Sequence, residues 1–119
     1  MGRQLKKETK NILQTDDLSE VLGKLRQQPQ RKLINALIAC LYEPEDRVRW
    51  HAITAIGEAV AALAQEDMEA SREIVRRLMW NLNDESGGIG WGAPEAMGEI
   101  LSREPVLARE YASILLSYV

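Results

Sequence analysis

A 41-residue internal repeat is the feature that most constrains what this 119-residue chain can fold into. When residues 31–60 are written above residues 72–101 without a gap, the apolar positions of the two segments coincide. Several identical residues recur at this one offset, namely Trp50 and Trp91, Ala52 and Ala93, Ala55 and Ala96, Gly57 and Gly98, and Glu58 and Glu99. A repeat of this length indicates supersecondary units that bury their apolar faces against one another.

Each unit has helical rather than strand periodicity. Apolar residues fall at positions 33, 34, 37, 38 and 41, and again at 52, 55, 56, 59, 60 and 63. These spacings place them on one side of a helix. Turn-forming residues separate the two halves of each unit, at 43–47 and 84–90. The pattern predicts an all-α protein of helix–turn–helix units, with further helices near 4–14, 17–27 and 105–118.

The repeat also predicts how a single domain, 1–119, is organised. Residues 1–29 form an N-terminal cap of two helices, 30–65 a first unit, 66–103 a second, and 104–119 a half-unit. The last helix is poor in charge on a face that no second helix covers. It either folds back as a cap, associates with another chain, including a second copy of this one, or belongs to a longer array. Association or truncation is favoured.

Gly57 and Gly98 stand at equivalent positions inside predicted helices. Glycine in a helix interior costs up to about 1 kcal/mol relative to alanine. Its presence at both points therefore predicts that a neighbouring helix crosses close to the backbone at each of them.

The segment from Asp46 to Glu58 resembles the core of a HEAT or PBS-lyase HEAT-like repeat, which has an acid, a Val-Arg pair, spaced alanines and an aliphatic-Gly pair. The resemblance covers about residues 30–103. It implies a short right-handed α–α superhelix, a HEAT-like solenoid of about two full repeats with half-unit ends. It also implies that Asp46 and Arg49 form a ladder between repeats. The second unit departs from this pattern, because Gly87 and Gly90 stand at the equivalent positions.

In similar repeat proteins the second helix of each unit lines the concave face. Its candidate binding residues here are Trp50, Thr54, Glu58, Trp91, Glu95 and Glu99. The two tryptophans either pack between helices or form a recognition surface, since Trp is enriched in binding hot spots. The glutamates are either a solvated face or an acidic patch that suits a basic protein segment.

A glycine-rich stretch lies between the helices of the second unit. It contains Asp84, Gly87, Gly88, Gly90 and Gly92. Such a loop resembles a phosphate-binding loop, but a helix precedes it and no Walker-type lysine follows. It is either an inter-helix turn or a site for a small ligand.

Charge is distributed unevenly along the chain. Residues 1–32 carry eight basic and four acidic residues, whereas 33–119 carry seven basic and fourteen acidic ones, for a formal net charge of −3. An acidic body opposes binding to nucleic acid. The sequence therefore favours a non-enzymatic scaffold or adaptor whose partner is another protein.

Two other functions remain open at this stage. Some DNA-alkylation-repair glycosylases are similar HEAT-like solenoids, and Trp91 with Asp84 or Glu95 is the nearest match to their sites. HEAT-like bilin lyases, which attach or chaperone a pigment, are the second analogy.

Few residues point to catalysis or to a cofactor. His51 is the only histidine, and Cys40 is the only cysteine, so neither a triad nor an internal disulfide is indicated. We expect no metal, no cofactor and no enzymatic activity. The sequence has no apolar run long enough for a membrane span and no secretory signal at its start, which predicts a cytoplasmic protein.

Overall fold

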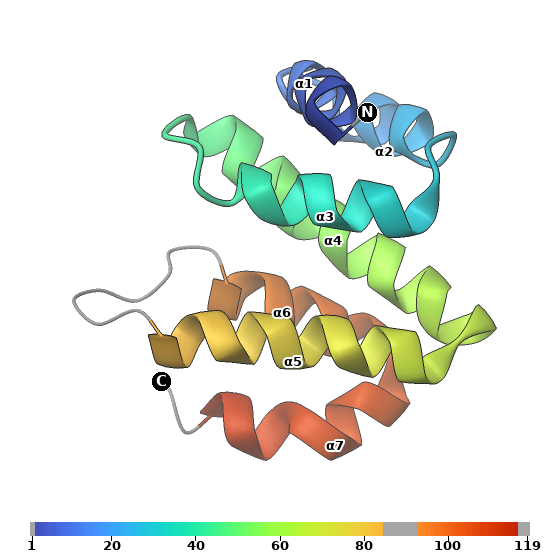
Figure 1. Ribbon diagram of the computed structural model, residues 1–119, viewed down its shortest axis with the longest axis vertical. Coiled ribbons are helices and arrows are strands. Elements are labelled where there is room, and N and C mark those ends of the chain that lie inside the picture. The colour runs from blue at the N-terminus through green and yellow to red at the C-terminus, as the bar shows by residue number, and fades with distance from the viewer. Residues whose placement is uncertain (1, 85–92, 117–119) are drawn as a thin grey trace.

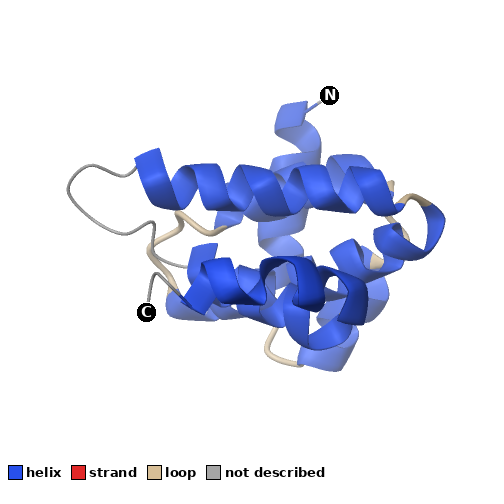
Figure 2. Ribbon diagram, turned by 90° about the horizontal axis from the view of Figure 1, so that it is seen from below, coloured by secondary structure: helices blue, strands red, loops and turns tan. Residues whose placement is uncertain are grey.

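Helices and short turns make up the part of the chain that the structure describes. The computed structural model describes the backbone of residues 2–84 and 93–116, and the side chains of residues 5–80 and 93–113. The helices are α1 (Gly2–Leu13), α2 (Leu18–Leu25), α3 (Gln30–Cys40), α4 (Asp46–Glu66), α5 (Met68–Asp84), α6 (Ala93–Arg103) and α7 (Pro105–Leu116). No strand occurs within these ranges (Figure 2). The predicted all-α class is therefore confirmed for the described residues.

The helices form two antiparallel pairs that lie one above the other (Figure 1). The upper pair is α3 and α4, the lower pair is α5 and α6, and the two pairs meet mainly where α4 packs against α6. α1 packs against α3 and α4 at one end of the molecule, while α7 packs against α6 at the other. The pairs coincide with the two units that the repeat predicted.

Side-chain caps and prolines fix where the helices begin. The Asp17 carboxylate accepts a hydrogen bond from the Ser19 amide at 3.0 Å at the start of α2. Asp67 accepts one from the Ala70 amide at 3.1 Å at the start of α5. Pro105 is the first residue of α7, where its missing N–H leaves no helical hydrogen bond unmade. These caps satisfy backbone groups that a helix terminus would otherwise leave unpaired.

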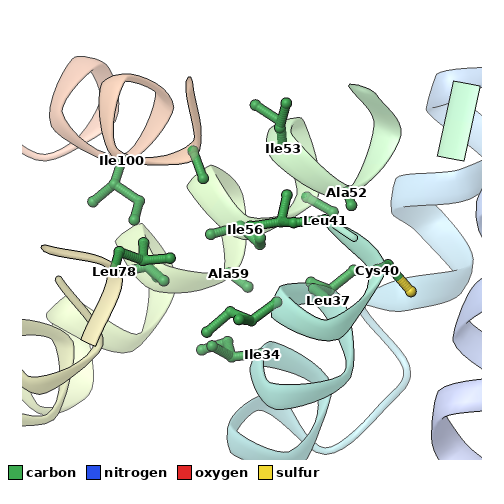
Figure 3. Packing of buried hydrophobic residues seen from close by; sticks show 14 of the residues in the cluster. Ile34, Leu37, Cys40, Leu41, Ala52, Ile53, Ile56, Ala59, Leu78 and Ile100 are labelled. Atoms are coloured by element: carbon green, nitrogen blue, oxygen red, sulfur yellow. The ribbon is translucent and has the colours of Figure 1, made fainter. Parts of the chain in front are cut away.

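One apolar core runs through both pairs (Figure 3). Ile34 and Leu37 of α3 point toward Ile56 of α4, and Leu78 of α5 and Ile100 of α6 approach from the other side. All five side chains are fully buried. α4 therefore packs against its partner helix α3 and against both helices of the other pair.

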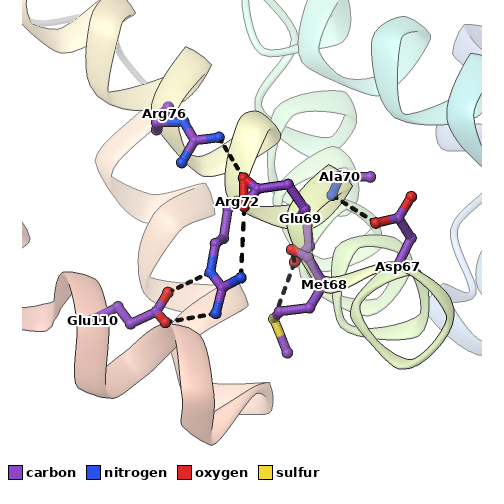
Figure 4. A network of polar contacts seen from close by, with 8 residues as sticks. Asp67, Met68, Glu69, Ala70, Arg72, Arg76 and Glu110 are labelled. Carbon is purple, nitrogen blue, oxygen red and sulfur yellow. Dashed lines mark hydrogen bonds and ion pairs between the residues drawn. The ribbon is translucent and has the colours of Figure 1, made fainter.

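Ion pairs on the outside of this core connect parts of the chain that are not consecutive, and Figure 4 shows one of them. Arg72 of α5 binds both carboxylate oxygens of Glu110 on α7, at 2.9 and 2.8 Å. Arg31 of α3 donates to Asp67 at 2.9 Å, just before α5. The Ala70 amide and the Arg31 guanidinium together hold the pKa of Asp67 below its usual value. These contacts tie the beginning of α5 to the helices on both sides of it.

Candidate protein-binding surface

Three of the predicted binding residues lie in one row along α4. Trp50, Thr54 and Glu58 are four residues apart, so they lie on the same side of the helix. The Trp50 side chain is 50% exposed, and Thr54 and Glu58 are partly exposed. Trp50 is therefore a surface residue near the start of α4 and does not close the core.

The glutamates of this surface have arginine partners. Glu58 accepts a hydrogen bond at 2.5 Å from Nε of Arg26, the residue that follows α2. Glu99 accepts one at 3.2 Å from Nε of Arg103, one turn later on α6. The surface therefore has mixed charge rather than the purely acidic character that the sequence indicated. Arg26 is 32 residues from Glu58 in the chain, so the local sequence pattern around Glu58 does not predict this pairing.

Gly57 lies where α6 crosses α4. A Cβ atom placed on Gly57 would be 2.8 Å from Cβ of Glu99 and 3.2 Å from the backbone carbonyl carbon of the same residue. The predicted close approach is confirmed here. At Gly98 it is wrong for the described part of the chain, where no heavy atom of a neighbouring element lies within 4 Å of a Cβ built at that position.

The difference between the two glycines extends to their neighbours on each helix. Ile53, Gly57 and Val60 form one row along α4, and all three are buried. The equivalent residues of the second unit are Pro94, Gly98 and Leu101 on α6, and all three are only partly buried. We call these last three residues the α6 stripe. The sequence did not lead us to predict the α6 stripe, although the 41-residue alignment places its three residues opposite Ile53, Gly57 and Val60.

Asp46 and Arg49 meet at the start of α4. Arg49 Nη2 pairs with Asp46 one turn earlier. Nη1 of the same side chain donates to the carbonyl oxygens of Glu43 and Pro44, at 2.8 and 2.9 Å. These bonds close the turn between α3 and α4 within a single unit, whereas the family resemblance implied a ladder between repeats.

Several predicted residues lie outside the described part of the chain. They are Trp91, Gly87, Gly88, Gly90 and Gly92, together with the side chain of Asp84. Glu95 lies in the first turn of α6 and is partly exposed. On α5, Val75 and Leu78 are fully buried, whereas Trp80 is 69% exposed.

A pocket lies beside the α4 row. It has a volume of about 270 Å³ and opens between the end of α2, the start of α3 and the middle of α4. Glu58 and Arg26 stand at its mouth. The sequence reasoning did not identify this pocket, because its wall combines residues from three helices that only the fold brings together.

Cys40 and His51, whose residue types are often catalytic, are both held within the packing of the helices. Cys40 is fully buried, and burial raises the pKa of its thiol to about 11. The thiol therefore stays protonated at neutral pH, and the thiolate is the reactive form. His51 Nδ1 lies 2.9 Å from the carbonyl oxygen of Leu13, which ties α4 to the end of α1. No group of three or more His, Cys, Asp or Glu side chains within the described ranges could hold a metal ion.

Comparison with known proteins gives one relative of unknown function. An uncharacterized protein of Archaeoglobus fulgidus is 34% identical over 83 residues, which cover 66% of this chain and 42% of the relative. The chain thus spans less than half of that protein's length. No family model and no solved structure matches the sequence. Among the described residues, no helix is both long and apolar enough to cross a membrane.

Proposed function

We propose that this protein is a non-enzymatic HEAT-like scaffold that binds an α-helix of another protein along the α6 stripe. The stripe is the observation that carries the proposal. In the first unit the same three positions are buried and Gly57 lies against Glu99 of α6, whereas in the second unit all three are only partly buried.

The arrangement of the helices supports the HEAT-like part of the proposal. Two antiparallel pairs related by a 41-residue repeat pack through their second helices, α4 and α6. Gly57 allows this contact to be close, since Cβ of Glu99 fills the space that a side chain at Gly57 would need. Regular stacking of a further unit would bring a helix to Gly98 in the same way.

The chemistry of the stripe supports a helix as the occupant. Pro94, Gly98 and Leu101 are apolar or small and follow the i, i+4, i+7 spacing of one helix face. Glycine at the centre of such a face permits close approach of a second backbone. The α4–α6 contact provides a template within the same molecule, so the expected partner is an amphipathic helix with an apolar stripe of its own.

Trp50 extends the proposed surface on the side of α4. It lies in the second turn of α4, the helix that packs against α6. A half-exposed indole offers a large apolar contact at small entropic cost. We expect it to contribute to binding where the partner also reaches α4.

The proposal is tested by filling the position at Gly98. Gly98→Leu should block a helix from approaching. We expect it to fold, because Gly98 is only partly buried and a Cβ there meets no neighbouring element within 4 Å among the described residues. Gly23→Leu is the matched control on α2, where a Cβ likewise meets nothing within 4 Å. The wild-type chain and both variants are compared by affinity capture from an extract of the source organism, and by light scattering of the purified proteins.

Loss of one specific partner, or of self-association, in Gly98→Leu but not in Gly23→Leu is the expected result. Equal capture and equal mass for all three proteins would contradict the proposal. A change in mass alone would identify the partner helix as that of a second copy.

A further inference from the structure

The pocket beside α4 has an apolar wall made by three helices. That wall consists of Leu22, Leu25, Leu33, Ala55, Ala59 and Ala62. Its volume of about 270 Å³ is just below the roughly 300 Å³ at which pockets for drug-sized ligands begin. The space therefore suits a compact apolar group rather than a large cofactor.

Alanines on α4 are the reason that this space is not filled. Ala55, Ala59 and Ala62 lie on one side of the helix at i, i+4 and i+7, where larger side chains would reach the leucines of α2. Here α2 is only eight residues long, and the short side chains leave a pocket instead.

Of the two charged side chains that line the pocket, Arg26 is the more exposed. Nε of Arg26 donates to Glu58, but the two terminal nitrogens of Arg26 have no further partner among the described residues. The Arg26 side chain is 63% exposed, whereas that of Glu58 is 24% exposed. A guanidinium held at Nε with its outer donors available matches the geometry of a carboxylate.

We propose that this pocket binds a free medium-chain carboxylic acid. The alkyl chain lies among the leucines and alanines, and the carboxylate accepts hydrogen bonds from the terminal nitrogens of Arg26. Glu58 is a positioning residue, because it holds Nε of Arg26 and so orients the guanidinium at the mouth. This site is separate from the α6 stripe and does not depend on it.

The proposal is tested with three probes of equal chain length, namely sodium octanoate, octanol and octylamine. Each is titrated into the full chain carrying ¹³C-labelled leucine methyl groups, and binding is followed by NMR. We expect octanoate to shift the methyl signals of Leu22, Leu25 and Leu33. The affinity for octanol should be lower by a factor of about ten or more, because octanol cannot form the charge-assisted hydrogen bonds to Arg26. Octylamine should bind more weakly still.

Substitutions at Arg26 and at Ala62 separate the polar from the apolar part of the site. Arg26→Gln should weaken octanoate binding about tenfold and leave octanol binding unchanged. Ala62→Leu, at an exposed position on the wall, should abolish binding of both, whereas Ala61→Leu on the neighbouring surface should leave both intact. Gly98→Leu should also leave octanoate binding intact, so failure of the proposed function and failure of this site are distinguishable.

Three results would overturn the proposal. The first is that octanoate shifts none of these methyl signals. The second is that Arg26 does not select the carboxylate. In that case the three probes bind equally well, or Arg26→Gln leaves the affinity for octanoate unchanged. The third is that a peptide with a C-terminal leucine carboxylate binds the pocket while octanoate does not, which would make the pocket a docking site for a protein.

Discussion

At the scale of single residues, Gly57 and Gly98 show how identical side chains can have different roles. Both stand at the same position of the repeat, inside a helix. At Gly57 the neighbouring backbone of Glu99 occupies the space of a Cβ, so glycine is required for the α4–α6 contact. At Gly98 that space is open. Glycine there only lowers helix stability unless another helix is bound.

This difference predicts opposite effects of the same substitution. Gly57→Ala should lower the free energy of unfolding by about 1–3 kcal/mol, because the new methyl group forces α6 away from α4. Gly98→Ala should raise it by up to about 1 kcal/mol, because alanine favours a helix and meets no clash. Gly23→Ala on α2 is the control for that gain. Urea denaturation measures all three, and a Gly57→Ala variant as stable as Gly98→Ala would contradict the close crossing.

Some residue-level features could be predicted from the sequence and others could not. The need for glycine at Gly57 follows from its cost within a helix, and the structure confirms it. The exposure of Trp80 and the pairing of Glu58 with Arg26 do not follow. Both depend on which helix lies opposite, and local spacing contains no information on contacts that are 32 residues apart.

At the scale of helices, the corner between α6 and α7 depends on one carboxylate. Glu104 lies between the two helices and is buried, with an exposed fraction of 5%. Its carboxylate accepts a hydrogen bond from the Val106 amide at 2.6 Å and one from Nε2 of Gln65 at 3.2 Å. It thereby caps α7 and ties this corner to the end of α4.

Loss of this carboxylate should therefore weaken the attachment of α7. Glu104→Ala removes a cap and leaves the Gln65 amide without this partner, and we expect a loss of about 1–2 kcal/mol in the free energy of unfolding. Glu104→Gln retains an acceptor oxygen and is the matched control. Thermal denaturation, together with hydrogen exchange of α7 amides, measures the effect. Equal stability of the alanine and glutamine variants would show that the cap is not needed.

The existence of most helices could be predicted, because apolar spacing and turn residues are local signals. The expected helices at 4–14, 17–27 and 105–118 correspond to α1, α2 and α7 within a few residues. The pocket between α2, α3 and α4 could not be predicted. It arises from the short length of α2 and from the packing of three separate helices, which no single segment encodes.

At the scale of the whole molecule, the repeat leaves one helix edge without its equivalent neighbour. Ile53, Gly57 and Val60 of α4 are buried, and α6 crosses α4 at Gly57, whereas the α6 stripe is only partly buried. The repeat in the sequence predicted the two units, but only the packing distinguishes a covered edge from an open one. We propose that this partly open edge of α6 binds a helix of another protein.

Site-specific cross-linking tests this claim most directly. Ser102 is exposed and lies next to Leu101 of the stripe, and Ser19 is an equally exposed control on α2. A cysteine-reactive photo-cross-linker is attached to Ser102→Cys or Ser19→Cys, since the fully buried Cys40 does not compete for the label. We expect Ser102→Cys alone to cross-link one partner within a helical segment, and the additional change Gly98→Leu to abolish that product. Equal cross-linking from both positions, or a product that Gly98→Leu leaves unchanged, would contradict the claim.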